Sequence, residues 1–390
     1  MEPMLVPEGD PDLHDLVFEL IHKAASLAGQ LRPAVQQEIG RLVRSMNCYY
    51  SNFIEGHQTH PRDIEKALAK DLSGDEKQRD LKEEAIAHIT VQQRIDTGND
   101  EQSWPTSEKY LQWLHREFCS QLPRTMLRVK AKDSGREVDV VPGEYRRDFV
   151  DVGHHVPPPP SEVPIFMNRF EQAYAPSHLS KIQKLLSVAT AHHRLLWIHP
   201  FVDGNGRVAR LMSHALLLKL GIGSSLWSVS RGLARNVDKY KEMLTVADSP
   251  RRHDSDGRGA LSLEGLKSFS SFFLQICIDQ IDFMASLLNP SEIIRRIEIY
   301  VKDEIAAKRL PKGSFEMLRE AYYQGEVPRG RAPEITGYEE RRARETVSVL
   351  VEKGLLLSKS HRAPLTLGFP IDILERWLPT LYPVDTRNLS

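Results

Sequence analysis

Apolar residues recur three and four positions apart along most of this chain, which is the spacing of amphipathic helices. The pattern predicts helices through residues 13–98, near residues 107–121 and in a long run from Ser180 to Ile198. One segment, residues 148–152, instead has the composition of a short strand and is followed by a tight turn at Gly153. The pattern therefore predicts a mainly α-helical protein with one β-hairpin.

The pattern changes near residue 291. Three further helical segments are predicted, and the last of them ends at Gly354. Residues 356–369 then suit a strand, a turn and a second strand. This order resembles a winged helix-turn-helix. Its candidate recognition helix carries Arg341, Arg342 and Arg344, but residues 326–362 hold eight Lys/Arg against six Asp/Glu, so DNA binding is an option that is not favoured.

Charge and composition exclude several classes of protein. The 390 residues carry a formal net charge of −1, so there is no global basic field of the kind that attracts nucleic acid. The three cysteines, Cys48, Cys119 and Cys277, are far apart and form no disulfide-like framework, which suits a reducing cytosol. Neither a signal peptide nor an apolar run long enough to span a membrane is evident. We therefore expect a cytoplasmic protein without a membrane partner.

The strongest chemical signal is the segment His199-Pro-Phe-Val-Asp-Gly-Asn-Gly-Arg-Val-Ala-Arg210. Gly204 and Gly206 allow a left-handed turn, and a helical pattern follows. A glycine loop that leads into a helix presents free N–H groups, which suits a phosphate. Arg207 and Arg210 share the first turn of that helix, where the helix dipole disfavours cations unless an anion is bound. The segment thus predicts a polyphosphate site.

Two residues of this segment have chemistry suited to catalysis. His199 carries an imidazole that titrates near neutral pH, so it is a candidate general base for a hydroxyl. Asp203 offers the hard oxygen ligands that Mg²⁺ prefers, and Mg²⁺ bridges phosphate oxygens. The groups expected to hold phosphates are Gly204, Asn205, Gly206, Arg207 and Arg210.

The segment resembles the signature of the Fic family, H-P-F-x-[DE]-G-N-G-R-x-x-R, and every fixed position matches. The resemblance implies a helical Fic core that transfers AMP from ATP to a Ser, Thr or Tyr hydroxyl of a target protein, with Mg²⁺ as cofactor. It also implies a nucleotidyltransferase whose partners are ATP and that target, with a homodimer as a further option. The domains we expect are an N-terminal helical region (1–105), a catalytic core (106–288) and a winged-helix-like domain (289–390).

A second segment, Ser51-Asn-Phe-Ile-Glu55-Gly56, resembles the Fic inhibitory motif [ST]-x-x-x-E-[GN]. A glutamate at a helix C-terminus is badly placed for the helix dipole and needs another partner. The resemblance supplies Arg210 as this partner, the arginine otherwise used for the γ-phosphate. We therefore expect a Glu55–Arg210 ion pair in the resting enzyme, with Ser51 helping to hold the inhibitory helix.

Two more regions have counterparts in the Fic family. The residues Val150, Asp151, Val152 and Gly153 fall where Fic proteins have a β-hairpin flap, which registers the target peptide by strand addition. Residues 236–248 resemble the segment beside the adenine and suggest Tyr240 and Leu244 as adenine contacts, with core packing as the alternative. An amide is common in relatives where this chain has Asp248, which leaves the nucleotide preference open.

Three alternatives remain open at this point. The enzyme could remove AMP from its target, in which case Glu55 would position a water. It could use another nucleotide or a phosphoryl donor. A non-enzymatic alternative is a DNA-binding regulator that senses nucleotide, although the intact His199 argues against this. His192 and His193 lie near the motif but lack zinc-site spacing, so we assign them to packing or supporting roles.

Overall fold

The computed structural model describes residues 1–57, 59–130, 136–150, 152–153, 155–223 and 225–382. The chain divides into two compact units, which are described separately here. The larger unit comprises Met1–Ala24, Asn47–Ser224 and Ser228–Gln280, and the smaller unit comprises Ala25–Met46, Ser225–Trp227 and Ile281–Ser390. Three helices contribute residues to both units: α1 (Pro11–Gly29), α2 (Pro33–Ile54) and α11 (Leu263–Leu287). Each of these units is made of separate segments of the chain, whereas the three predicted domains are continuous. The boundaries of those domains stay predictions.

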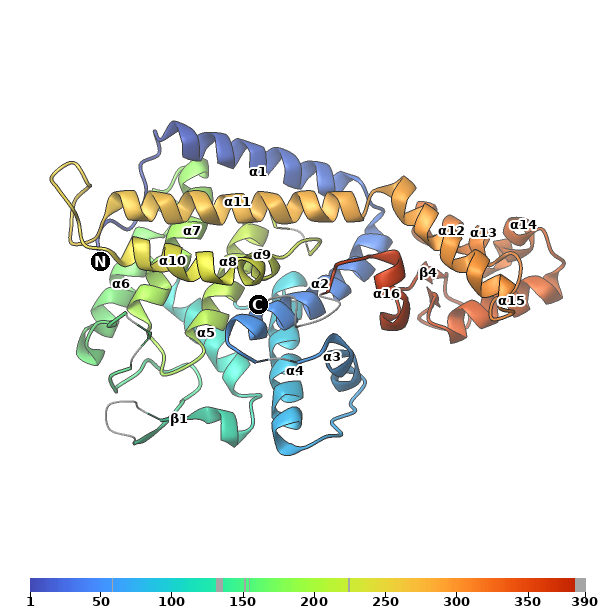
Figure 1. Cartoon of the computed structure of the whole chain (residues 1–390), viewed down its shortest axis with the longest axis horizontal. Coiled ribbons are helices and arrows are strands. Elements are labelled where there is room, and N and C mark those ends of the chain that lie inside the picture. Colours follow the sequence, from blue (N-terminus) through green and yellow to red (C-terminus); the bar gives the residue numbers. More distant parts are fainter. Residues whose placement is uncertain (58, 131–135, 151, 154, 224, 383–390) are drawn as a thin grey trace. The chain divides into compact units, whose positions relative to one another are not determined.

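The larger unit is built mainly from α-helices (Figure 1). Its remaining helices are α3 (Pro61–Leu68), α4 (Glu76–Asp96), α5 (Glu108–Cys119), α6 (Val163–Ala173), α7 (Lys181–Ile198), α8 (Asn205–Lys219), α9 (Val229–Arg235) and α10 (Val237–Asp248). Three short 3₁₀ turns are η1 (Arg124–Leu127), η2 (Pro160–Glu162) and η3 (Pro176–His178). The helices predicted from apolar spacing are present, which confirms the mainly α fold class.

The pair α7 and α8 forms the centre of the larger unit, and the two helices pack against each other. α7 begins with a capping box, in which the Ser180 hydroxyl accepts from the Gln183 N–H and the Gln183 side chain accepts from the Ser180 N–H. Most positions of both helices are buried, because α4, α5, α6 and α10 also contact one or the other. The six residues between the two helices are therefore held at both ends by rigid, buried structure.

The β-structure of the larger unit lies in a different place from the predicted hairpin. Strands β1 (Arg128–Lys130) and β2 (Glu137–Asp139) form an antiparallel pair that the apolar pattern did not indicate. At the predicted flap, the described residues form only a single antiparallel bridge between Val152 and His155. Asp151, which belonged to that prediction, lies outside the described residues.

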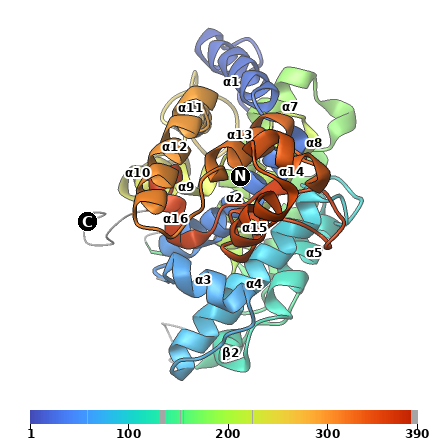
Figure 2. The same ribbon diagram turned by 90° about the vertical axis from the view of Figure 1, so that its right-hand side faces the viewer.

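The smaller unit contains the C-terminal helices and a short antiparallel pair of strands. Its elements are α12 (Pro290–Ala306), α13 (Ser314–Gln324), η4 (Arg329–Arg331), α14 (Ala332–Thr336), α15 (Glu340–Glu352), β3 (Leu356–Leu357), β4 (Thr366–Leu367) and α16 (Ile371–Trp377). Figure 2 shows α13, α14 and α15 gathered together, and each of the three contacts the other two. The three predicted helices and the two strands occur in the predicted order as α12, α13, α15, β3 and β4, but η4, α14 and α16 were not predicted. The assignment as a winged helix stays a prediction.

The arginines of α15 are accompanied by carboxylates of the same helix. Arg341 contacts Glu345 at 3.3 Å, and Arg344 contacts Glu340 at 2.7 Å. These i,i+4 pairs weaken the cationic field that a DNA backbone requires.

Within the described ranges, no single helix is long and apolar enough to cross a membrane. Only α11 and α12, taken together as a bent pair, pass a test of length and composition.

Candidate active site

The catalytic segment begins where α7 ends. His199 adopts a left-handed backbone conformation with φ 50°, which is unusual for a residue other than glycine and stops the helix abruptly. Arg146 stabilises this turn, since its Nε donates to the His199 carbonyl at 2.7 Å and its main-chain N–H donates to Pro200 O at 2.8 Å. Another guanidinium nitrogen of Arg146 donates to Pro158 O. Arg146 is itself buried. Its hydrogen bonds connect the His199 turn to Pro158, in the chain that follows the predicted flap.

The environment of His199 keeps its imidazole neutral. Burial, together with the nearby positive charge of Arg146, lowers the pKa of His199 to about 3. Its Nδ1 is buried and has no hydrogen-bond partner among the described residues. A neutral imidazole at physiological pH can accept a proton, which is the state that a general base requires.

The loop after His199 is braced by a stacked aromatic pair. Phe201 is fully buried and stacks on His115 of α5, with ring centroids 3.9 Å apart and planes 2° from parallel. The His115 Nδ1 accepts from the Gly143 N–H at 2.8 Å, so the ring proton lies on Nε2, which donates to Asp203 O at 3.2 Å. Burial lowers the pKa of His115 to about 4, in agreement with this neutral tautomer. His115 thus holds the main chain of the loop in place.

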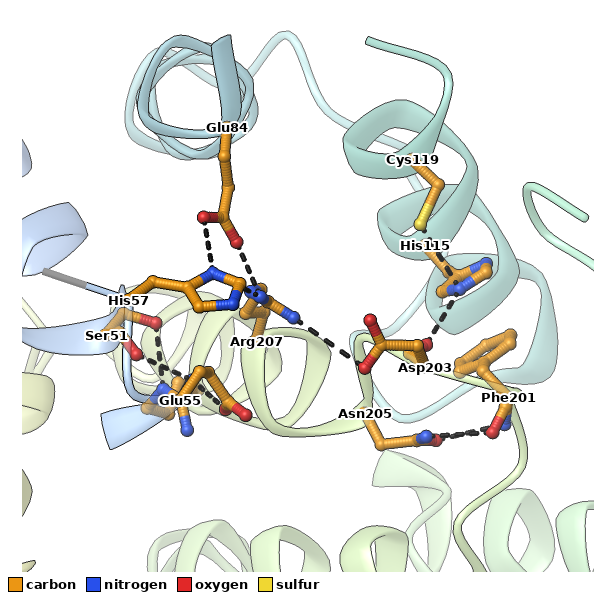
Figure 3. Close-up of polar contacts among 11 residues, drawn as sticks. Ser51, Glu55, His57, Glu84, His115, Cys119, Phe201, Asp203, Asn205 and Arg207 are labelled. Atoms are coloured by element: carbon orange, nitrogen blue, oxygen red, sulfur yellow. Dashed lines mark hydrogen bonds and ion pairs between the residues drawn. The ribbon is translucent and has the colours of Figure 1, made fainter. Parts of the chain in front are cut away.

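The Asn205 side chain closes the same loop. Its amide nitrogen donates to Phe201 O at 2.9 Å, and its oxygen accepts from the Phe201 N–H at 3.0 Å (Figure 3). Asn205 is 2% exposed. In this structure the Asn205 side chain therefore shapes the loop, and the free N–H groups at the start of α8 are left as the donors available to a phosphate.

Asp203 has the chemistry of a Mg²⁺ ligand. Its side chain is 49% exposed, and its carboxylate makes only a long contact, 3.9 Å, with Arg207 Nη1. The described part of the chain contains no cluster of three or more metal-ligating side chains. A single carboxylate fits Mg²⁺, which keeps most of its water and is commonly bound through one or two carboxylates and the phosphates of a substrate.

The Glu55 carboxylate lies against the first turn of α8. α8 follows Gly204, whose φ of 81° is left-handed, and its first turn contains Gly206. A side chain at position 206 would collide with Glu55 Oε1, because this oxygen lies closer to the position of a Cβ atom than van der Waals contact allows. The acidic side chain of the inhibitory motif therefore lies where the sequence predicts a phosphate.

Arg210 holds Glu55 in this position, as the sequence predicts. The Arg210 Nη2 donates to Glu55 Oε1 at 2.6 Å and to Ser51 O at 3.1 Å, while its Nε donates to Ser51 Oγ at 2.9 Å. Burial alone would raise the Glu55 pKa, but the charges of Arg210 and Arg207 lower it to about 2. The pair is consequently ionised at physiological pH. Arg210 thus binds both Ser51 of α2 and Glu55, the residue that follows this helix.

Arg207 has a different partner. Its Nη2 lies 2.5 Å from Glu84 Oε1, in a buried ion pair with α4 that the sequence did not reveal. The other oxygen of Glu84 accepts from His57 Nδ1 at 2.7 Å (Figure 3). Burial alone would raise the pKa of Glu84, yet the charge of Arg207 and the His57 hydrogen bond keep it below its usual value. Both arginines of the motif are thus paired with glutamates.

The residues suggested as adenine contacts are placed differently from each other. Tyr240 is 3% exposed, and its hydroxyl lies 2.7 Å from His192 Nε2, which assigns it to the core. Leu244 is half-buried on the same helix, and its carbonyl accepts from His193 Nε2 at 3.2 Å. Asp248 lies 3.0 Å from His193 Nε2 and 3.5 Å from His155 Nδ1, so its charge is used within the protein. Of the two suggested contacts, only Leu244 retains an accessible side chain.

Comparison with known proteins identifies the central region. Residues 105–217 match the Fic/DOC family. Two curated relatives, each called protein adenylyltransferase Fic, come from Drosophila erecta (38% identical over 98 residues, 25% of this chain) and Drosophila virilis (48% identical over 79 residues, 20% of this chain). The matched segments span only 20% and 16% of the length of those relatives.

Solved structures extend the similarity in fold to most of the chain. A Fic family protein from Desulfovibrio desulfuricans aligns over 93% of this chain and 97% of its own, with a TM-score of 0.54 and 18% identity. Fic-1 from C. elegans aligns over 70% of this chain and 71% of its own, with a TM-score of 0.51 and 17% identity. At these identities the structures indicate shared architecture only. The matched region and the motif that it contains identify residues 105–217 as a Fic/DOC domain.

Proposed function

We propose that this protein is a Mg²⁺-dependent adenylyltransferase that transfers AMP from ATP to a hydroxyl group of a target protein. The observation that carries this proposal is the placement of Glu55. A carboxylate lies against Gly206 and Arg210 at the start of α8, which supports an anion site at that point. The curated relatives that match this region are protein adenylyltransferases.

Each chemical task of the reaction has a residue suited to it. The hydroxyl oxygen of the target attacks the α-phosphorus, His199 accepts the hydroxyl proton, and pyrophosphate leaves. The N–H groups at the start of α8 stabilise the negative charge that develops on the α-phosphate oxygens. Arg210 binds the γ-phosphate. Asp203 would hold Mg²⁺, which would supply positive charge to neutralise the phosphates.

The same placement makes the resting protein inhibited. Arg210 cannot bind Glu55 and a γ-phosphate in the same bidentate geometry. ATP that enters beside Glu55 has its phosphate tail displaced, and a misplacement of about 1 Å can cost on the order of 10²-fold in rate. Removal of Glu55 should therefore raise the rate of transfer.

The proposal is tested with ATP labelled at either the α- or the γ-phosphate and the Glu55→Gly variant. We expect label in protein, including self-modified enzyme, from α-labelled ATP only. Glu55→Gly combined with His199→Ala is the matched control and should lower transfer by about 10²–10⁴-fold. Label from the γ-position alone would replace the proposal with phosphoryl transfer, and preference for GTP or CTP in competition would replace ATP as the donor. Faster loss of AMP from a modified target by wild type than by Glu55→Gly would favour AMP removal.

A further inference from the structure

Glu84 differs from Glu55 in how firmly it is held. Its side chain is 0% exposed and lies within the 21-residue helix α4, which packs against α3, α5 and α8. Both carboxylate oxygens are engaged, one by Arg207 at 2.5 Å and the other by His57 at 2.7 Å. The Glu55 side chain is 28% exposed and lies just beyond the end of α2, before Gly56. Only Glu55 can move away without disrupting a buried helix.

Arg207 is a buried cation whose position depends on Glu84. Its side chain is 5% exposed, and its guanidinium carbon lies 5.5 Å from the centre of the Phe118 ring. Burial alone would lower the Arg207 pKa, but Glu84, followed by Glu55 and Asp203, raises it, so the group stays charged. A buried charge that loses its partner turns to the nearest available carboxylate. In a protein that also lacks Glu55, that carboxylate is Asp203, whose Oδ1 lies 3.9 Å from Arg207 Nη1.

We propose that Glu84 is a positioning residue, which holds Arg207 away from Asp203 in the inhibited and the active enzyme alike. This inference rests on the proposed function. With Arg207 paired to Glu84, its contact with Asp203 stays long, which leaves the half-exposed Asp203 carboxylate accessible to a divalent cation. Without Glu84, Arg207 competes with that cation for Asp203. Glu84 therefore supports the reaction, although it contacts a motif arginine just as the inhibitory Glu55 does.

The test introduces Glu84→Gln into the Glu55→Gly background, where inhibition is absent. Substitutions of residues that orient a metal ligand typically cost about 10–100-fold in metal affinity or activity, and we expect a change of that size. The Mg²⁺ concentration for half-maximal transfer should rise. Binding of Mn²⁺ in the presence of a non-hydrolysable ATP analogue, followed by electron paramagnetic resonance, should weaken in parallel without any turnover.

Asp96→Asn is the matched control. Asp96 is a second buried carboxylate of α4, and it pairs with His214 of α8 at 2.6 Å instead of with a motif arginine. It should leave the Mn²⁺ affinity unchanged. If Glu84→Gln does not fold, Glu84→Asp keeps the charge one methylene further back and should weaken Mn²⁺ binding by a smaller factor.

The two proposals fail in different ways. Unchanged Mn²⁺ affinity in a folded Glu84 variant, or faster transfer, would overturn the positioning role while AMP transfer by Glu55→Gly still stood. Absence of AMP transfer by Glu55→Gly itself would instead overturn the proposed function. An equal loss of Mn²⁺ affinity in Asp96→Asn would show a general effect of damaging α4 and would also overturn the assignment to Glu84.

Discussion

The two glutamate–arginine pairs of the site use the same chemistry in different surroundings. Glu55–Arg210 and Glu84–Arg207 are separated by 2.6 and 2.5 Å, and both arginines are buried. The glutamates differ, because Glu55 is partly exposed beyond a helix end and Glu84 is enclosed within a helix. A removable partner suits regulation, whereas a fixed partner suits support of the site. The exposure of the acidic partner, more than the distance, separates the two pairs.

The largest expected effect tests whether the transfer that is released by removing Glu55 depends on His199. His199→Ala in the Glu55→Gly background should lower AMP transfer by about 10²–10⁴-fold, the usual contribution of a general base. ATP binding, followed by calorimetry, should change little because the phosphate-binding groups remain. Substantial transfer by this double variant would mean that relief of inhibition works through another base.

The next effect is a difference in how much each glutamate contributes to the free energy of unfolding. Glu84→Ala leaves Arg207 as an uncompensated buried charge, so the free energy of unfolding should fall by about 3–5 kcal/mol. Glu55→Ala should cost about 1 kcal/mol or less, because Glu55 is partly exposed and Arg210 keeps its bonds to Ser51. Urea denaturation of the two variants measures the difference. Equal losses would contradict the contrast in burial.

The smallest effect concerns pH. The Glu55 pKa is about 2 and that of Glu84 lies below its usual 4.5, so both carboxylates stay ionised at pH 5. Their stabilisation is present above the unfolded pKa of about 4.5 and is lost only as the pH falls further. The ratio of transfer by Glu55→Gly to transfer by wild type should thus stay within about twofold between pH 8 and pH 5. Convergence of the two rates at pH 5 would show that protonation releases Glu55.

The Glu55–Arg210 contact could be predicted because each residue belongs to a recognisable local motif. The loop between α7 and α8 was likewise predictable, since Gly204 and Gly206 mark the turn and the apolar pattern marks the helix. The three helical segments near the C-terminus followed from apolar spacing alone. Local sequence was sufficient wherever backbone conformation or a short motif determined the structure.

The supporting residues were not predictable in this way. Glu84 follows Lys82 and Glu83, a run of charges that is more typical of a solvated helix face. His115 and Arg146 act on main-chain groups of the His199–Asp203 segment, from positions more than fifty residues away. Such partners are chosen by tertiary packing, which leaves no spacing signal in the sequence. Asn205 bonds to Phe201, four residues earlier in the same motif, and its predicted role at a phosphate stays a prediction.

The central claim is that the two glutamates act in opposite directions, and one measurement tests it most directly. The initial rate of AMP transfer from α-labelled ATP is compared for wild type, Glu55→Gln and Glu84→Gln at equal protein and Mg²⁺ concentrations. Both substitutions remove one negative charge and keep the side-chain shape. We expect Glu55→Gln to raise the rate by about tenfold, because the variant releases Arg210 from a charge-assisted bond worth roughly 1.5–3 kcal/mol. We expect Glu84→Gln to lower the rate, and an increase in both variants would contradict the account.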